Sequence, residues 1–310
     1  MNKSYKIISL YCFSQIKKDL ILNLRQELLA YDDHGLCGLI ILAEEGINGT
    51  ICGNEQIVNK CYEKIKKFFK NYDLNEKISF SKKRVFKKLK IKIKPEIVTM
   101  GMSNINPESK SGIYLDPNQW NSLLRDEQTI IIDTRNHYEV SLGTFANSIN
   151  PNINNFREFP NWLDKNMNKL IKNNQNTNIA MFCTGGIRCE KATSLLRIKG
   201  FENVYHLKGG ILKYLENISS DKNLYEGECY VFDERVALDN KLERGSYSIC
   251  HACGMPLSSE DKKKMHFIEG IQCHLCVDKF TDSDRARFAE RQKFIEDKTK
   301  KLDFPINKNS

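Results

Sequence analysis

The alternation of short apolar runs with helical patterns over residues 5–96 constrains the fold of this chain more than any other feature. A first run, YKIISLYCF, is rich in β-branched and aromatic residues, and KKDLILNLRQELLAY repeats apolar residues at three- and four-residue spacing. Two short strands (LCGLIILA and GINGTICG), a helix (EQIVNKCYEKIKKFFKNY) and a strand region ending in FKKLKIKIKPEIV follow. The order βαββαβ predicts an α/β domain of ferredoxin-like topology over residues 1–100.

A second alternation begins after residues 101–112 (GMSNINPESKSG), whose Gly, Ser, Asn and Pro content is typical of a linker. The apolar runs TIIIDTR, NIAMFCT and NVYHL alternate with helical stretches, which predicts a doubly wound parallel sheet over residues 113–222. In residues 223–310, cysteines and histidines cluster ahead of the charged run SDRARFAERQKFIEDKTKK. This pattern predicts a small C-terminal cysteine-rich region with a helical tail.

The most distinctive local motif is CTGGIRCEKA, which begins at Cys183. The apolar run NIAMF precedes Cys183, so the thiol is expected at the carboxyl end of a parallel strand, where open α/β sheets bind ligands. Glycines let the next turn point its amides inward, and a helix starting near Cys189 adds the positive end of its dipole. We interpret Cys183 as a reactive thiolate rather than a buried structural cysteine. The predicted anion-binding loop is Thr184, Gly185, Gly186, Ile187 and Arg188.

Arg188 is the cation of this loop, and a guanidinium there suits an oxyanion, a phosphate or the charge that develops in sulfur transfer. Cysteine phosphatases combine the same groups but have five residues between Cys and Arg, whereas four separate Cys183 from Arg188, which disfavours phosphatase activity. Asp133 and Arg135 end a strand and are expected to form a supporting charge-assisted pair. Cys189 is either a resolving thiol for Cys183 or a small residue at a helix start.

Two C-x-x-C pairs in the C-terminal region are separated by 19 residues. Two residues between cysteines let both sulfurs of a turn reach one ion, and two such turns complete a tetrahedron. The spacing predicts a structural zinc site without an open position for catalysis. A redox pair and four free thiols are the alternatives. The candidate ligands are Cys250, Cys253, Cys273 and Cys276.

Positive charge is concentrated in residues 82–94 (KKRVFKKLKIKIK), which hold eight basic residues and no acid, within a chain of net charge +9. The alternation in LKIKIK places lysines along one face of a strand. Such a run is often only a solvated surface, but beside an anion-binding loop it favours contact with a phosphate backbone. The candidate nucleic-acid-binding residues are Lys82, Lys83, Arg84, Lys87, Lys88 and Lys90.

The sequence contains no stretch near the roughly 18 apolar residues that a membrane span needs, so no membrane partner is expected. Eleven cysteines, an odd number, in a chain without a secretion signal favour reduced thiols over a disulfide framework. Together these features predict a cytoplasmic protein.

Residues 113–222 resemble the rhodanese domain, in which a cysteine carries a persulfide held by main-chain amides. The resemblance rests on CTGGIRCEKA, on IIDTRNHYEVSLGTFANSINPNI and on the closing motif YHLKGGILKYLE. One departure is that Thr144 and Phe145 stand where the family usually has His and Ile.

Nearly the whole chain is similar to the rhodanese-domain tRNA uridine hydroxylase family, through AEEGINGT, KIKPEIVTMG, CTGGIRCEKA, GECYVFDERV and the CHAC and CHLC pairs. The resemblance implies an acylphosphatase-like first domain and an oxygen-dependent conversion of the wobble uridine of tRNA to 5-hydroxyuridine. It also implies molecular oxygen as co-substrate and Cys183 as the essential cysteine, with a persulfide-type intermediate.

The residues by themselves favour a different chemistry, because a nucleophilic thiol among amides stores a sulfane sulfur well. No set of histidines and carboxylates is typical of non-haem iron, and no flavin or nicotinamide motif is present. Two enzymatic hypotheses follow: a tRNA uridine hydroxylase, and a sulfurtransferase using thiosulfate or a persulfide. A non-catalytic RNA-binding protein is disfavoured because Cys183, both glycines and Arg188 are intact.

Overall fold

A computed structural model of the protein describes residues 4–102, 105–171 and 177–303. The chain divides into two compact units. The first comprises Met1–Glu234 with Leu238–Glu243, and the second comprises Arg235–Ala237 with Arg244–Ser310. Within the described residues, no helix is both long enough and apolar enough to cross a membrane.

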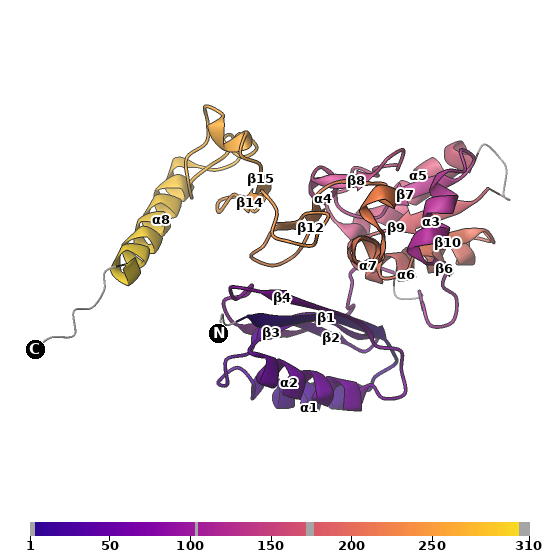
Figure 1. Ribbon diagram of the computed structural model, residues 1–310, viewed down its shortest axis with the longest axis horizontal. Helices are drawn as coiled ribbons and strands as arrows, with labels where there is room; N and C mark the ends of the chain where they lie inside the picture. Colours follow the sequence, from indigo (N-terminus) through magenta and orange to yellow (C-terminus); the bar gives the residue numbers. More distant parts are fainter. Residues whose placement is uncertain (1–3, 103–104, 172–176, 304–310) are drawn as a thin grey trace, which may run out of the picture. The chain divides into compact units, whose positions relative to one another are not determined.

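The first unit begins with a five-stranded sheet, here called the first sheet, in the order β4-β1-β3-β2-β5. Strand β1 is antiparallel to β3 and β4, and β2 is antiparallel to β3 and parallel to β5. Both helices lie on one face of this sheet (Figure 1). The predicted βαββαβ arrangement is confirmed, with the last strand region divided into β4 and β5. The elements are β1 (Tyr5–Phe13), α1 (Lys18–Leu29), β2 (Cys37–Ala43), β3 (Gly46–Gly53), α2 (Glu55–Phe68), β4 (Asn75–Ser81) and β5 (Leu89–Ile93).

Alternation along β1 separates the two faces of the first sheet. Ile8, Leu10 and Cys12 join the core formed with α1 and α2. Tyr11, their neighbour in sequence, points to the opposite face because side chains alternate along a strand. The helix-free face of the sheet therefore presents Tyr11 to another part of the first unit.

The second sheet, also in the first unit, has four parallel strands in the order β6-β10-β9-β7. Its strands are β6 (Ile113–Leu115), β7 (Ile130–Asp133), β9 (Ile179–Phe182) and β10 (Val204–Leu207), and its helices are α3 (Pro117–Leu124), α5 (Phe159–Ile171), α6 (Ile187–Ile198) and α7 (Gly210–Asn217). Ile179 and Met181 pack in a core with α5 and α6, whereas Ala180 and Phe182 pack with α3 and α7. Apolar cores on both faces confirm the predicted doubly wound parallel sheet.

Shorter elements complete the first unit. Strands β8 and β11 form an antiparallel pair beside the second sheet. Ile105, in the segment predicted as a linker, is buried in the same core as Phe156, so this segment is anchored to the domain that it precedes. The bounds are α4 (His137–Val140), β8 (Gly143–Phe145), η1 (Phe156–Glu158), η2 (Ser220–Lys222), β11 (Tyr225–Gly227), β12 (Cys229–Tyr230) and β13 (Ala237–Leu238), the last of which spans the boundary between the units.

The second unit contains the predicted cysteine-rich region and helix. Its elements are the antiparallel pair β14 (Ser248–Ile249) and β15 (Pro256–Leu257), the 3-10 helix η3 (Asp261–Lys263) and α8 (Asp282–Asp303). The start of α8 is stabilised by reciprocal bonds between Thr281 and Asp284, in which each side chain accepts from the backbone amide of the other. Cysteine side chains and Leu257 form the small core of this unit.

Candidate functional site

The Cys183 side chain lies at the carboxyl end of β9, where the chain turns into α6. The amide of Gly186 donates a hydrogen bond to the Cys183 sulfur at 3.1 Å. Gly186 has a φ of 100°, a backbone region that side-chain-bearing residues rarely adopt. Glycine is favoured at this position because the loop adopts that backbone conformation where its amide turns toward the sulfur.

The surroundings of Cys183 stabilise its thiolate. Burial raises the pKa of a thiol, but here the hydrogen bond from the Cys189 thiol, the charge of Arg188 and the amides of both residues outweigh it. The pKa of Cys183 is lowered to about 6. Burial and the neighbouring Cys183 raise the pKa of Cys189, so Cys189 stays a protonated donor. The thiolate form of Cys183 is therefore favoured at neutral pH, with the Cys189 thiol as a hydrogen-bond donor to it.

Arg188 is held by Glu139, a residue that the motif analysis did not single out. Two guanidinium nitrogens donate to the two Glu139 carboxylate oxygens, each at 2.7 Å, and both side chains are buried. Glu139 lies on α4, and its carboxylate is oriented by a further hydrogen bond that it accepts from the backbone amide of Asn136 at 3.1 Å. With this bidentate pair formed, Arg188 supplies a fixed positive charge beside the thiolate and retains limited donor capacity for a further anion.

Asp133 and Arg135 form the predicted pair, with a shortest distance of 2.6 Å and both side chains fully buried. Thr144, which departs from the rhodanese pattern, donates to the same Asp133 carboxylate at 2.9 Å. Arg135 also donates to the carbonyl of Gly143 at 2.5 Å. These contacts join the end of β7 to β8. The pair therefore supports the wall of the domain built on the second sheet instead of the thiol itself.

The closing motif KGGILKYLE contacts the thiol loop through backbone hydrogen bonds. The amide of Ile211 donates to the Cys183 carbonyl at 2.9 Å, and that of Leu212 donates to the Thr184 carbonyl at 3.1 Å. A Cβ at Gly210 would lie 2.7 Å from the Thr184 carbonyl oxygen, and its φ is 65°. The glycines of this motif therefore allow the start of α7 to approach the loop, a contact that the sequence alone does not specify.

The basic residues of 82–94 lie in the segment between β4 and β5, on β5 itself and directly after it, and not at the thiol loop. Leu89 and Ile91 belong to the core under the helices, so Lys90 projects from the helix-free face of β5. Lys87 makes a long ion pair with exposed Glu234 at 3.9 Å. The candidate tRNA-binding residues Lys82, Lys83, Arg84, Lys87, Lys88 and Lys90 are all exposed.

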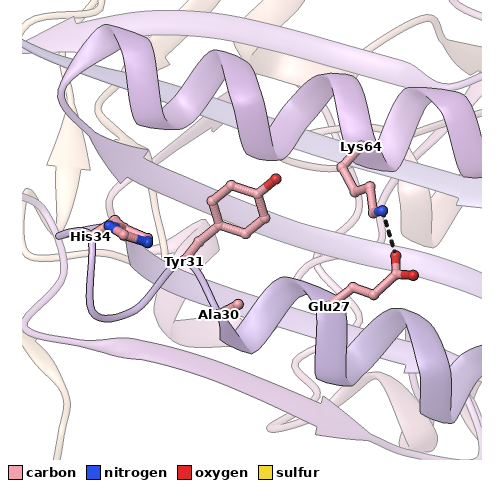
Figure 2. A pocket seen from close by; sticks show the side chains of 5 residues that line it. All are labelled: Glu27, Ala30, Tyr31, His34 and Lys64. Atoms are coloured by element: carbon pink, nitrogen blue, oxygen red, sulfur yellow. Dashed lines mark ion pairs between the residues drawn. The ribbon is translucent and has the colours of Figure 1, made fainter.

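A surface cavity of about 380 Å³ lies between α1 and α2. It is lined by Glu27, Ala30, Tyr31, His34 and Lys64, and Figure 2 shows the Lys64–Glu27 ion pair bridging the two helices at 2.9 Å. None of these residues belongs to the thiol loop, so the cavity is separate from the chemistry expected at Cys183.

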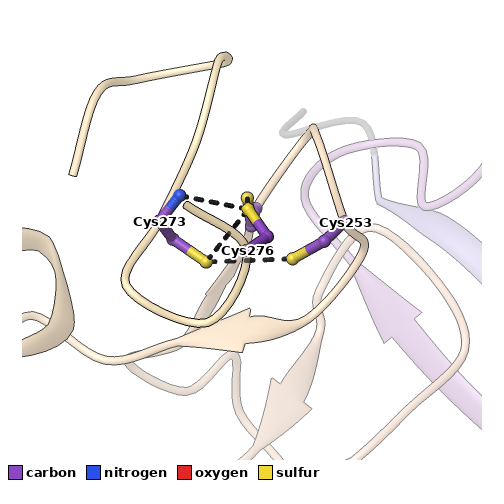
Figure 3. Close-up of side chains that lie close together, drawn as sticks. Cys253, Cys273 and Cys276 are labelled. Carbon is purple, nitrogen blue, oxygen red and sulfur yellow. Dashed lines mark hydrogen bonds between the residues drawn. The ribbon is translucent and has the colours of Figure 1, made fainter. Parts of the chain in front are cut away.

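The four C-terminal cysteines converge on one point in the second unit. The sulfur-to-sulfur distances are 3.7 Å for Cys273–Cys276 and 3.8 Å for Cys253–Cys273 (Figure 3). The Cys250 and Cys276 sulfurs are 4.0 Å apart. A tetrahedral zinc site with Zn–S bonds of about 2.3 Å places its sulfurs about 3.8 Å apart. The four thiols therefore fit one zinc ion, and Gly254, with a φ of 78°, closes the first turn.

Comparison with known proteins adds to this geometry. Residues 5–97 match the family model described as UPF0176 acylphosphatase like domain, and residues 116–217 match the Rhodanese-like domain. A tRNA uridine(34) hydroxylase of Prochlorococcus marinus (strain MIT 9312) is 58% identical over 295 residues, which cover 95% of this chain and 95% of that protein. Another, from P. marinus subsp. pastoris, is 57% identical over 305 residues, covering 97% and 98% respectively. The solution structure of a rhodanese-like domain from Anabaena sp. is 21% identical, covers 37% of this chain and 78% of that chain, and has a TM-score of 0.29.

Proposed function

The chain belongs to the tRNA uridine(34) hydroxylase family, and from that premise we propose that it converts the wobble uridine of tRNA to 5-hydroxyuridine in an oxygen-dependent reaction. The observation that carries this proposal is the 58% identity over 95% of both chains, together with an intact thiolate loop. The proposed substrates are tRNA and molecular oxygen.

Cys183 is the proposed reactive group of this enzyme. The Gly186 amide and the Arg188 charge favour its thiolate, and Glu139 holds Arg188 in place. Residues Thr184 to Arg188 are the proposed anion-binding loop, and Asp133 with Arg135 is the proposed supporting pair in the wall of the domain that carries this loop. Cys189 is proposed as a thiol donor to Cys183, because burial beside the thiolate keeps its own proton in place.

Sulfur transfer is the second candidate function. It is favoured by the match of residues 116–217 to the rhodanese model and by the amide that binds the sulfur. In this function the Cys183 thiolate would attack the sulfane sulfur of thiosulfate, releasing sulfite, or that of a persulfide, releasing a thiolate. The resulting Cys183 persulfide would pass its outer sulfur to an acceptor thiolate or to cyanide, which regenerates the Cys183 thiolate. Production of thiocyanate from thiosulfate and cyanide is its direct assay.

Deletion of the gene is expected to remove 5-hydroxyuridine from the tRNA of cells grown in air. The measurement is mass analysis of nucleosides from purified tRNA, with the gene restored on a plasmid as the control. Unchanged 5-hydroxyuridine would contradict the hydroxylase proposal. If 5-hydroxyuridine were unchanged and the purified protein produced thiocyanate, sulfur transfer would replace hydroxylation as the proposed function.

The basic residues of 82–94 are proposed to bind the phosphate backbone of tRNA. Replacing Lys83, Lys88 and Lys90 together by glutamine is expected to weaken tRNA binding by about tenfold or more. The dependence of log affinity on log salt should also become shallower, by about 0.7 to 0.9 for each phosphate that the variant no longer neutralises. Filter binding or fluorescence anisotropy over a salt series measures both effects.

A matched triple replacement on α2 and the turn that follows it separates local contact from net charge. Lys60, Lys67 and Lys70 are exposed on the helix side of the same domain, and their change to glutamine removes the same charge. This control should retain most of the affinity. Equal loss in the two triple variants would mean that only the overall charge of the protein attracts tRNA.

The four-cysteine cluster is proposed to hold a structural zinc ion. Its sulfur geometry fits a tetrahedral site, and four thiolates leave no open position on the metal. When bound, the ion would cross-link the Cys250–Cys253 turn to the Cys273–Cys276 turn. The residues on both turns would then stabilise the fold of the second unit without contacting substrate.

Residues 1–100, 113–222 and 223–310 are proposed as the functional domains, with 101–112 as the connection. The family models, which match 5–97 and 116–217, support the first two. The proposed compartment is the cytoplasm, since the proposed substrate is tRNA.

A further inference from the structure

One of the two acids in the AEEG turn between β2 and β3 contacts helix α6, which packs on the second sheet of the first unit. Glu44 is exposed, whereas Glu45 forms an ion pair with Lys191 on α6 at 2.7 Å. The other Glu45 oxygen accepts from the Ile97 amide at 2.7 Å. The Glu45 carboxylate therefore links the hairpin to the helix that follows the thiol loop.

A second carboxylate binds the same lysine. Glu96 pairs with Lys191 at 2.7 Å and accepts from the amides of Met100 and Gly101, each at 2.9 Å. Lys191 is fully buried, and an ammonium ion removed from water is stable only when it is paired. Two of the sequence motifs, AEEGINGT and KIKPEIVTMG, therefore meet at one residue of CTGGIRCEKA and fix the first sheet against α6.

Glu190, the neighbour of Lys191, makes a second connection to the first sheet. Its two carboxylate oxygens accept hydrogen bonds from the hydroxyls of Tyr11 at 3.1 Å and Tyr114 at 2.7 Å. Tyr11 comes from the helix-free face of β1, and Tyr114 comes from β6. The first turn of α6 is thus held from both sheets of the first unit.

The Tyr11 hydroxyl also lies against the thiol loop. A Cβ added at Gly186 would meet that hydroxyl at 3.0 Å, and the Gly186 amide is the donor to the Cys183 sulfur. We propose that Tyr11 is a positioning residue of the thiol site, which acts through Glu190 and Gly186 to hold the Gly186 amide on the Cys183 sulfur. The first domain would then complete the site in addition to binding tRNA.

Several charged groups face Cys183 and must be separated in a test. Arg188 and the Cys189 thiol favour the thiolate, whereas the Glu190 carboxylate and the thiolate repel each other. Tyr11 affects Glu190 as well, because its hydrogen bond lowers the pKa of that carboxyl against the effect of burial, and the net pKa is about 6. Replacing Glu190 by glutamine removes this charge while keeping an oxygen that accepts from Tyr11.

The test compares Tyr11→Phe/Glu190→Gln with Glu190→Gln alone. The pKa of the Cys183 thiol is measured from the ultraviolet absorbance of its thiolate as the pH is raised. The titration of the same protein carrying Cys183→Ser is subtracted to remove the signal of the other groups. Loss of the Tyr11 hydroxyl is expected to shift this titration upward by about half a pH unit or more, because a hydrogen bond to a charged group is weakened. Hydrogen exchange of a peptide covering residues 183–189 should become faster in the same variant.

The control is Tyr62→Phe in the Glu190→Gln background, which removes a hydroxyl from α2 on the other face of the first sheet. It should change neither the titration nor the exchange. Exchange in β1 and β3 peptides reports whether the first sheet remains folded. If Tyr11→Phe leaves both the thiolate titration and the 183–189 exchange unchanged in a folded protein, the proposal is wrong. Because neither measurement uses tRNA or oxygen, the result is independent of the proposed reaction.

Discussion

Replacing Cys183 with serine is expected to abolish the formation of 5-hydroxyuridine, lowering activity by a factor of about a thousand or more. Serine has a similar shape, so the loop should keep its structure. However, its hydroxyl does not ionise near neutral pH, whereas the Cys183 thiol has a pKa of about 6. The Gly186 amide and the Arg188 charge would then lack the anion that they stabilise in the wild-type protein.

The measurement is nucleoside mass analysis of tRNA from a deletion strain that expresses the variant. Cys61→Ser is a suitable control, since Cys61 is buried under the first sheet, away from the loop. Cys189→Ser should retain much of the activity, because a hydroxyl can still donate to the Cys183 thiolate. A loss as large as that of Cys183→Ser would assign Cys189 a covalent role as resolving thiol. Hydroxylated tRNA made by Cys183→Ser would refute the assignment of Cys183.

Loss of zinc is expected to unfold the second unit while the first unit stays folded. The purified protein should contain about one zinc ion per chain, and Cys273→Ser should contain almost none. Structural zinc contributes apparent binding free energies of about 10 kcal/mol or more, which is large for the small core around Leu257. Metal analysis gives the zinc content, and hydrogen exchange of peptides from residues 244–297 reports the fold of the second unit.

His251→Asn is the matched control for this prediction, because His251 lies inside a C-x-x-C turn but its side chain is exposed. It should keep the zinc and the protection of the second unit. A wild-type protein purified without metal that still protects residues 244–297, or Cys273→Ser protein with full zinc content, would contradict the structural role of the ion.

Much of the architecture follows from local sequence patterns. Spaced apolar residues predict α2, and the continuous apolar run of β9 predicts a strand buried on both faces. Cys183 follows that strand and precedes two glycines and a helix start, which predicts a thiol in a turn lined by backbone amides. In the structure the Gly186 amide donates a hydrogen bond to the Cys183 sulfur. The two C-x-x-C pairs similarly predict a shared site because the turn geometry is local. The division of the last strand region into β4 and β5 does not follow from such patterns, because the basic stretch of residues 82–94 begins directly after β4 and includes β5.

The sequence by itself therefore determined the order of strands and helices, the thiol turn and the cysteine cluster, all of which depend on neighbouring residues. Tertiary structure alone decided which distant charges meet. Arg188 pairs with Glu139, 49 residues away, and Glu190 accepts from Tyr11, 179 residues away. Glu45 and Glu44 stand side by side in sequence, yet only Glu45 is paired with Lys191. Periodicity records which face of an element is buried, but a charged side chain finds its partner only when separate elements pack together and exclude water between them.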